Sequence, residues 1–228
     1  MGAVSALVAD EVERGLELEA RAALLEYVAE LWLAPAEERH FAGLKALEEL
    51  FPGTGLSRFA DPARIGELRA AFDAHMRIPG RQAILPYESS HLPETERIHG
   101  PERIADVAGL YATAGFDMEP FTQFPADHIG HELRFVAALL RREAALFPGS
   151  SAARNAFGWR TGFIREHPGL IVERLAARAR TVDAHPFFVG LADVTAALVA
   201  QAEDEPSDGQ QNNRGSVPIR SRAPLRPA

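Results

Sequence analysis

The sequence predicts an all-α fold, a single-domain bundle of roughly eight or more helices. Three observations carry this prediction. Alanine and leucine, which favour helices, supply 64 of the 228 residues, whereas valine, isoleucine and threonine, which favour strands, supply 28. Apolar residues recur at helical spacing along most of the chain. Proline and glycine divide these periodic segments at intervals typical of helices. A chain of this length fits one large domain.

The first predicted helix covers residues 5–33, where apolar residues repeat every three or four positions. It ends at Pro35, because proline cannot continue a helical hydrogen-bond ladder. A second helix is predicted over residues 36–50, ending before the turn that Pro52 begins.

Asp61 and Pro62 form a typical start signal, an N-cap followed by proline in the first turn. The helix that they begin is predicted to end before Pro79. A long loop follows over residues 79–100. Loops of this length without regular structure are uncommon and often functional.

Pro101 is predicted to begin the next helix, which Gly115 closes as the residue after the C-cap. A shorter loop over residues 116–124 leads into a helix predicted to run from Pro125 to Phe147. The remaining helices are predicted from their caps and prolines, and they cover residues from a Ser150 or Ser151 cap to His167, from Pro168 to Val182 and from Pro186 to Glu203.

The domain is predicted to end at Glu203, and residues 204–228 are predicted to be a disordered polar tail, because their composition has too little apolar content to offset the entropy of ordering. The whole chain has a net charge of −8 and the tail a net charge of +1, so residues 1–203 carry −9. An acidic chain is not expected to bind nucleic acid broadly.

Several function classes lack their sequence features. The chain contains no cysteine, which excludes disulfide scaffolds, thiolate metal sites and cysteine nucleophiles. It has no phosphate-binding loop, no signal peptide pattern at Met1–Glu13 and no apolar run near the 20 or so residues of a membrane span. The chain is therefore expected to be cytoplasmic and not inserted into a membrane.

The densest group of polar residues lies between Phe124 and Phe135, and three interpretations of it remain open. His128 and Glu132 are four residues apart on one helix face, beside Asp127 and His131, which allows a metal site. A structural role places Asp127 in the first helical turn, where the helix dipole favours an acid. The third interpretation is a binding site at a helix start beside the long loop.

Two further alternatives concern catalysis and binding. An all-α metal-dependent enzyme would use His128, His131 and Glu132, although their order is not that of the zincin motif. Ser89, next to Ser90, lacks the glycine elbow of a serine hydrolase. A helical adaptor for an unrelated peptide is the other alternative.

Trp159 and the Phe187–Phe188 pair are expected to be core residues, and His167 to be a helix C-terminal residue.

Five segments in a fixed order carry a family resemblance. They are Pro86-Tyr87-Glu88-Ser89-Ser90, Tyr111-x-x-x-Gly115, Pro125-x-Asp127-His128-x-x-x-Glu132-Leu133-x-Phe135, Phe163-x-x-x-His167 and Phe187-Phe188-x-x-Leu191-Ala192. This pattern resembles the TorD/DmsD family of redox-enzyme maturation chaperones over about residues 85–200. The resemblance implies a TorD-like chaperone domain over residues 1–203.

The resemblance also implies a function. Such a protein is a cytoplasmic chaperone, not an enzyme, and holds no cofactor or metal of its own. Its partner is the apo catalytic subunit of a DMSO-reductase-type molybdenum oxidoreductase, recognised in many cases through its twin-arginine signal peptide. Tyr87, Ser89, Asp127, His128 and Glu132 are the residues expected to bind the client. Either Asp127 and His128 contact the client, or they pin the 79–100 loop to the helix. The protein is expected to be a monomer or homodimer.

Overall fold

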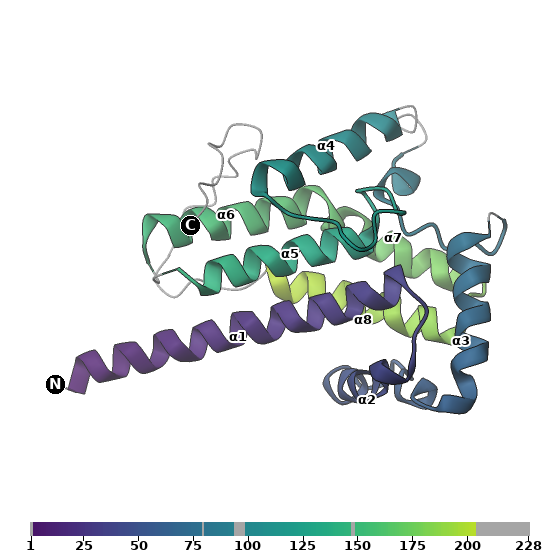
Figure 1. Ribbon diagram of the computed structural model, residues 1–228, viewed down its shortest axis with the longest axis horizontal. Coiled ribbons are helices and arrows are strands. Elements are labelled where there is room, and N and C mark those ends of the chain that lie inside the picture. The colour runs from purple at the N-terminus through teal and green to yellow at the C-terminus, as the bar shows by residue number, and fades with distance from the viewer. Residues whose placement is uncertain (1, 79, 94–98, 147–148, 204–228) are drawn as a thin grey trace.

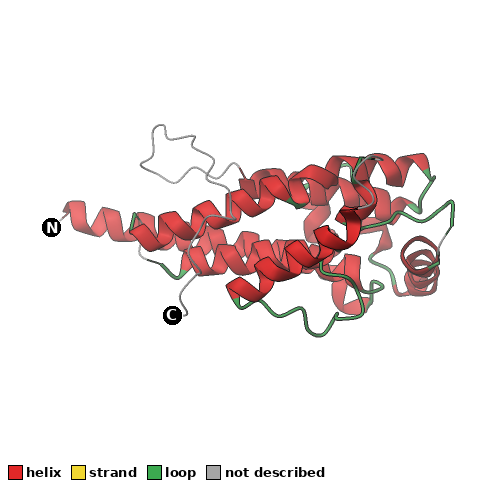
Figure 2. Ribbon diagram, turned by 90° about the horizontal axis from the view of Figure 1, so that it is seen from above, coloured by secondary structure: helices red, strands yellow, loops and turns green. Residues whose placement is uncertain are grey.

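The computed structural model describes the chain except for residues 1, 79, 94–98, 147–148 and 204–228. The described residues form eight α-helices and several single turns, with no strand among them, as Figures 1 and 2 show. The helices are α1 (Gly2–Leu33), α2 (Phe41–Leu50), α3 (Ile65–Phe72), α4 (Gly100–Ala114), α5 (Ile129–Ala144), α6 (Ser151–Glu166), α7 (Pro168–Thr181) and α8 (Pro186–Glu203). The predicted all-α single domain is confirmed. The predicted disordered tail lies outside the described residues.

Three of the predicted helix ends are visible as hydrogen bonds or backbone angles. The Asp61 side chain accepts a hydrogen bond from the Ala63 amide at 2.9 Å, and the Ser150 hydroxyl accepts one from the Ala153 amide at 3.1 Å. Gly115 has a φ of 69°, the left-handed conformation that follows many helices and that glycine adopts without strain.

Helix α1 begins at Gly2, three residues before its predicted start, and three other helices differ further from their predicted bounds. The helix expected over residues 36–50 opens with a 3₁₀ turn, Glu38–His40, before α2 begins. The region from Asp61 to Ile78 also divides, because a 3₁₀ turn precedes α3 and a π-helical turn, Asp73–Arg77, follows it. The helix expected from Pro125 begins only at Ile129, because the residues before it hydrogen-bond to the long loop.

Two long helices form the spine of the molecule. Figure 1 shows α1 running alongside α5, with α6 on the far side of α5. α7 packs on α6 and α8, and α8 also contacts α1. Gly130 lies where α1 and α5 approach each other. A Cβ atom at Gly130 would lie 2.5 Å from the Leu33 Cγ atom and 3.0 Å from the Ala29 carbonyl oxygen, so only glycine fits there without movement. Figure 1 also shows α3 standing across the end of this layer.

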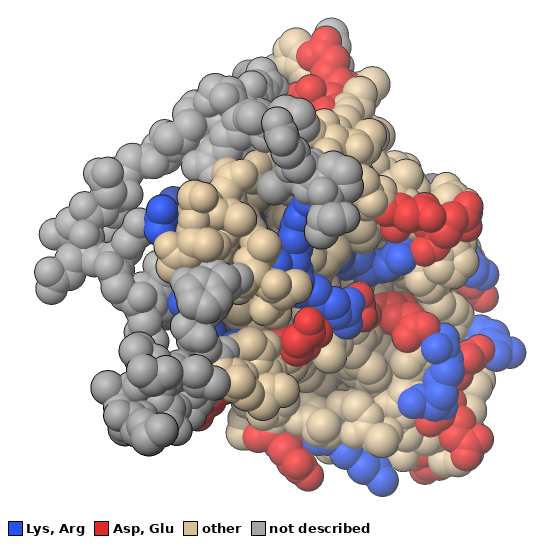
Figure 3. Space-filling model, turned by 60° about the vertical axis from the view of Figure 1, so that its left-hand side comes forward, with Lys and Arg blue, Asp and Glu red and all other residues tan. Residues whose placement is uncertain are grey.

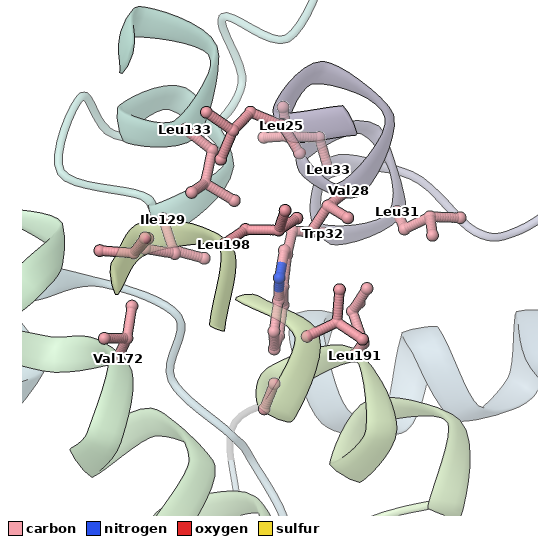
Figure 4. Packing of buried hydrophobic residues seen from close by; sticks show 14 of the residues in the cluster. Leu25, Val28, Leu31, Trp32, Leu33, Ile129, Leu133, Val172, Leu191 and Leu198 are labelled. Atoms are coloured by element: carbon pink, nitrogen blue, oxygen red, sulfur yellow. The ribbon is translucent and has the colours of Figure 1, made fainter. Parts of the chain in front are cut away.

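Buried aliphatic and aromatic side chains from these helices meet in one core. Figure 4 shows leucine and valine side chains of α1 facing α5 and α8 around the Trp32 ring. The Trp32 indole nitrogen donates to the Thr195 hydroxyl at 2.9 Å, which satisfies the one polar atom of this buried ring. Trp159, Phe187 and Phe188 are each 1% exposed, so the prediction that they are core residues is confirmed.

One described helix, α8, is long and apolar enough to cross a membrane, judged by length and composition alone. The sequence prediction had not anticipated this. Its 18-residue window has a mean hydropathy of 1.2 and is 56% buried inside the protein. The apolar side chains of α8 pack against α1, α6 and α7, as in the core helix of a bundle.

Acidic and basic side chains are mixed on the visible part of one face of the molecule. Figure 3 shows aspartate and glutamate interspersed with arginine and lysine there. Exposed ion pairs on the described surface include Arg180–Asp193 and Arg77–Asp73. Such pairs contribute little to stability.

Candidate functional site

The long loop is attached to the start of α5 by main-chain hydrogen bonds. The Glu88 amide donates to the Asp127 carbonyl at 2.9 Å, and the Ile129 amide donates to the Pro86 carbonyl at 2.8 Å. Tyr87 and His128 thereby form a single antiparallel bridge. This short ladder explains why α5 begins at Ile129: residues 127–129 pair with another segment instead of joining the helix.

The Asp127 side chain adds a further bond to this attachment. Its Oδ2 atom accepts a hydrogen bond from the Ser89 amide at 2.9 Å, while the residue is completely buried. Burial raises the pKa of Asp127 above its usual range and the Glu88 charge adds to the increase, whereas the hydrogen bonds from Ser89 oppose it. Asp127 therefore does not sit in the first turn of α5, as the structural interpretation expected. It lies two residues before the helix.

His128 is the N-cap of α5. Its Nδ1 atom accepts a hydrogen bond from the Gly130 amide at 3.0 Å, so the ring proton is assigned to Nε2. The ring is fully buried, edge-on to Tyr87 at 5.2 Å and tilted against Phe124 at 4.7 Å. Burial, followed by the neighbouring His131, lowers the pKa of His128 to about 3. The ring is thus neutral near pH 7, and a pH response between 6 and 7 is not expected of His128 in this conformation.

Glu132 is a further buried polar residue beneath the long loop. It lies next to Glu88, and both carboxyl groups are buried. Burial, with the charges of Glu88 and Asp127, raises the pKa of Glu132 well above its usual range. Neither carboxyl oxygen of Glu132 has a hydrogen-bond partner among the described residues, and protonation removes the charge that would be costly to bury there.

Glu88 joins three parts of the chain. It forms an ion pair with Arg103 of α4, and its Oε2 atom lies 2.9 Å from the Nδ1 atom of His167, where α6 ends. His167 stacks on Phe163 with ring centres 4.6 Å apart. The prediction that His167 is a helix C-terminal residue is confirmed. Its bond to Glu88, 79 positions away, was not predicted.

His131 holds the shorter loop between α4 and α5. Its Nε2 atom lies 3.1 Å from the Phe121 carbonyl oxygen, and Arg134 donates to the Met118 carbonyl at 2.9 Å. Burial, followed by the charge of Arg134, lowers the pKa of His131 to about 4. Tyr111 reaches the same region, since its hydroxyl donates to the Ala126 carbonyl at 3.0 Å.

The alternative metal site is not formed by this arrangement. The His128 and His131 ring centres are 6.2 Å apart, and one nitrogen of each ring is engaged with the backbone. Among the residues that the structure describes, no group of three or more histidine, aspartate or glutamate side chains is placed to hold one metal ion.

The five residues predicted to bind the client lie together. Asp127, His128 and Glu132 are completely buried, whereas Tyr87 and Ser89 are partly exposed on the loop above them. Sequence reasoning did not single out two residues that complete the network, Arg103 and Glu88, although Glu88 stands inside the Pro86-Tyr87-Glu88 segment. A cavity of about 290 Å³ opens beside this network and is lined partly by Arg103 and His167.

Comparison with known proteins gives one match. No curated protein matches the chain, and no solved structure matches it. The family model described as nitrate reductase delta subunit matches residues 42–176, which include α2, the long loop, the start of α5 and most of α7. That family consists of redox-enzyme maturation proteins that act in molybdoenzyme assembly and is related to the TorD family. Because the match covers more than half of the chain, the protein belongs to the nitrate reductase delta subunit family.

Proposed function

We propose that this protein is a cytoplasmic chaperone that binds the apo catalytic subunit of a DMSO-reductase-type molybdenum oxidoreductase and assists its assembly and cofactor insertion. The observation that carries the proposal is the family match over residues 42–176. These residues include the loop–helix network, which consists of Tyr87, Glu88, Ser89, Arg103, Asp127, His128, Glu132 and His167. The family description makes the catalytic subunit of a nitrate reductase the first client to test. Where the client is exported, binding would precede export.

We further propose that the twin-arginine signal peptide of the client is the segment recognised. Such a peptide has a cationic start and an apolar middle. Residues 1–203 carry a net charge of −9, which attracts the cationic part and favours encounter more than affinity. A disordered peptide loses entropy when it binds, and this keeps the complex reversible.

The loop–helix network is the proposed contact region. Tyr87 and Ser89 are partly exposed, so they are the members of the network that a client can touch without a rearrangement. Asp127, His128 and Glu132 lie beneath them and fix the loop in place. In this proposal the buried residues act mainly through the loop, and an arginine of the client reaches Asp127 or Glu132 only if the loop lifts.

Affinity capture with the intact chain from its native host tests the proposal. The expected main partner is a molybdoenzyme catalytic subunit that lacks its cofactor. A double variant, Asp127→Ala with His128→Ala, is expected to lose capture. The matched control is Asp117→Ala with His99→Ala, because both residues are exposed and their hydrogen bonds are local, to Glu119 and Glu102 respectively.

Three outcomes contradict the proposal. Capture of an unrelated peptide-bearing protein in place of a molybdoenzyme would favour the helical adaptor. Near-stoichiometric zinc, iron or manganese in protein purified without chelator or affinity tag would favour the metal-dependent enzyme. Unchanged client binding by a folded Asp127→Ala, His128→Ala variant would remove the network from the binding site.

A further inference from the structure

Helix α1 has two apolar faces, of which only one is covered. Its buried face packs on α5 and α8 and includes Leu18, Ala22, Leu25 and Ala29. The opposite face carries four exposed residues at helical spacing, Val12, Leu16, Ala20 and Ala23, which we call the α1 stripe. Val12 is 57% exposed and Leu16 is 67% exposed.

Acidic side chains border the α1 stripe. By helical periodicity Glu13 and Glu17 lie along one edge, and Glu19 and Glu26 lie along the other. The α1 sequence contains seven acidic residues and two arginines, and none of the four stripe positions is basic. Glu17 pairs with Arg21 and Glu19 pairs with Arg141 at the surface. Such exposed ion pairs are weak, so the edges of the stripe still attract basic groups.

These features define the chemistry of an occupant. Two exposed branched side chains favour an apolar contact, and the acidic edges favour arginine or lysine on either side of it. A second copy of α1 would bring its own acidic edges against Glu13, Glu17, Glu19 and Glu26, and like charges facing each other across an interface are unfavourable. The suitable occupant is therefore basic and partly apolar.

The same chain contains a segment of this composition. Residues 214–228 include four arginines, no acidic residue and three large aliphatic residues, Val217, Ile219 and Leu225. The segment also contains prolines at positions 218, 224 and 227, a residue type that is compatible with an extended chain. An extended chain places apolar and basic side chains on the stripe and its acidic edges together.

The end of α8 brings this segment within reach. Arg21 of α1 donates to the Gln201 carbonyl at 3.1 Å, so α8 ends beside the middle of α1. The stripe extends from there toward the N-terminal end of α1, which projects beyond the other described helices in Figures 1 and 2. Eleven helical residues span about 17 Å, whereas the ten residues 204–213 span up to about 33 Å when extended.

We propose that residues 214–228 bind to the α1 stripe of the same molecule. Val217, Ile219 or Leu225 covers Val12 and Leu16, and the arginines of the segment lie along the glutamate edges. This interaction shields an apolar face of α1 that would otherwise be open to other molecules.

Disulfide trapping in the full-length chain tests the proposal, because the protein has no cysteine of its own. The test pair is Ala20→Cys in the stripe with Ser221→Cys in the segment. The matched control pair is Ala112→Cys, at an exposed alanine of α4, with the same Ser221→Cys. In dilute protein the test pair is expected to form an intramolecular disulfide about tenfold faster than the control pair, since docking raises the effective concentration of the two thiols.

A further pair of substitutions separates docking from chance collision. Adding Val12→Ser and Leu16→Ser to the test pair is expected to slow its disulfide formation to the control rate. Both residues are exposed, so the fold is expected to persist and an unchanged circular dichroism spectrum will verify it. Equal rates for the test and control pairs, or a test rate unaffected by the serine substitutions, would overturn the proposal. Disulfides formed mainly between molecules would instead assign the stripe to a second copy.

Discussion

The Ser89 amide donates a hydrogen bond of 2.9 Å to the Oδ2 atom of Asp127, although the two residues are 38 positions apart. The acceptor is a buried side chain and the donor is a loop backbone. A side chain before a helix thus fixes the position of a loop, and the partly exposed Tyr87 and Ser89 depend on it for their orientation. This relationship makes Asp127 the most informative single position in the network.

Asp127→Ala is expected to lower the free energy of unfolding by about 1–3 kcal/mol, because the half-buried Ser89 amide loses its acceptor. Asp127→Asn keeps an acceptor oxygen and is expected to cost less. Urea denaturation of both variants measures the difference. The control is Asp117→Ala, which removes an exposed local bond to the Glu119 amide and is expected to cost about 0.5 kcal/mol or less. Equal losses at the two aspartates would contradict the role assigned to Asp127.

The buried His128 ring predicts a loss of stability in acid. Its pKa is about 3 in the folded protein, against 6.5 for an unperturbed histidine. Between these values the unfolded chain binds the proton and the folded protein does not, so stability rises with pH and falls as pH is lowered below 6.5. The contribution of this one ring is about 5 kcal/mol over the whole range.

The variant His128→Asn isolates this contribution. Asparagine is a favoured N-cap, so the bond from the Gly130 amide is retained while the titrating ring is removed. Unfolding free energies measured below pH 6.5 are expected to depend less steeply on pH in the variant, by about 1.4 kcal/mol per pH unit. His99, whose side chain is 60% exposed, provides His99→Asn as the control for the substitution itself. An unchanged slope in His128→Asn would show that the ring is protonated in the folded protein.

Glu132 predicts the opposite dependence on pH. Its pKa is raised well above 4.5 in the folded protein. Above pH 4.5 the folded protein holds a proton that the unfolded chain releases, so this residue lowers stability as pH rises. Glu132→Gln no longer titrates, and its stability relative to the wild-type protein is expected to increase between about pH 5 and pH 8. Glu102→Gln, at a side chain that is 76% exposed, is the control for the substitution itself. A constant difference would mean that Glu132 is ionised throughout.

Helix ends were predictable from the sequence where a local signal sets them. Ser150 caps the start of α6 and Gly115 ends α4, as predicted, through bonds or angles within a few residues. Asp61 also acts as a cap, but of the 3₁₀ turn Pro62–Arg64 and not of α3. The start of α5 was predicted four residues too early, because Pro125 is a good helix start by local rules. Residues 127–129 instead pair with Pro86 and Glu88, and no local pattern encodes a bond between segments so far apart.

The candidate site was predictable to a similar degree. The motif segments named Tyr87, Ser89, Asp127, His128 and Glu132, and the structure brings all five together. Their burial was not predictable, because composition and spacing do not show which polar side chains a loop will cover. The Glu88–His167 pair joins residues 79 positions apart and required the packing of the whole bundle.

The close approach of α1 and α5 predicts that Gly130 tolerates no side chain. In Gly130→Ala the new Cβ atom would lie 2.5 Å from Leu33 Cγ and 3.0 Å from the Ala29 carbonyl oxygen. Separating the helices to relieve this overlap is expected to cost about 1–3 kcal/mol of unfolding free energy.

Gly109 in α4 is the matched control, because it is also helical and a Cβ atom there meets nothing within 4 Å. Gly109→Ala is expected to stabilise the protein by about 0.5–1 kcal/mol, since alanine favours helices over glycine. Thermal or urea denaturation of both variants gives the sign of each change, and a stabilising Gly130→Ala would mean that α1 and α5 pack further apart than the structure shows.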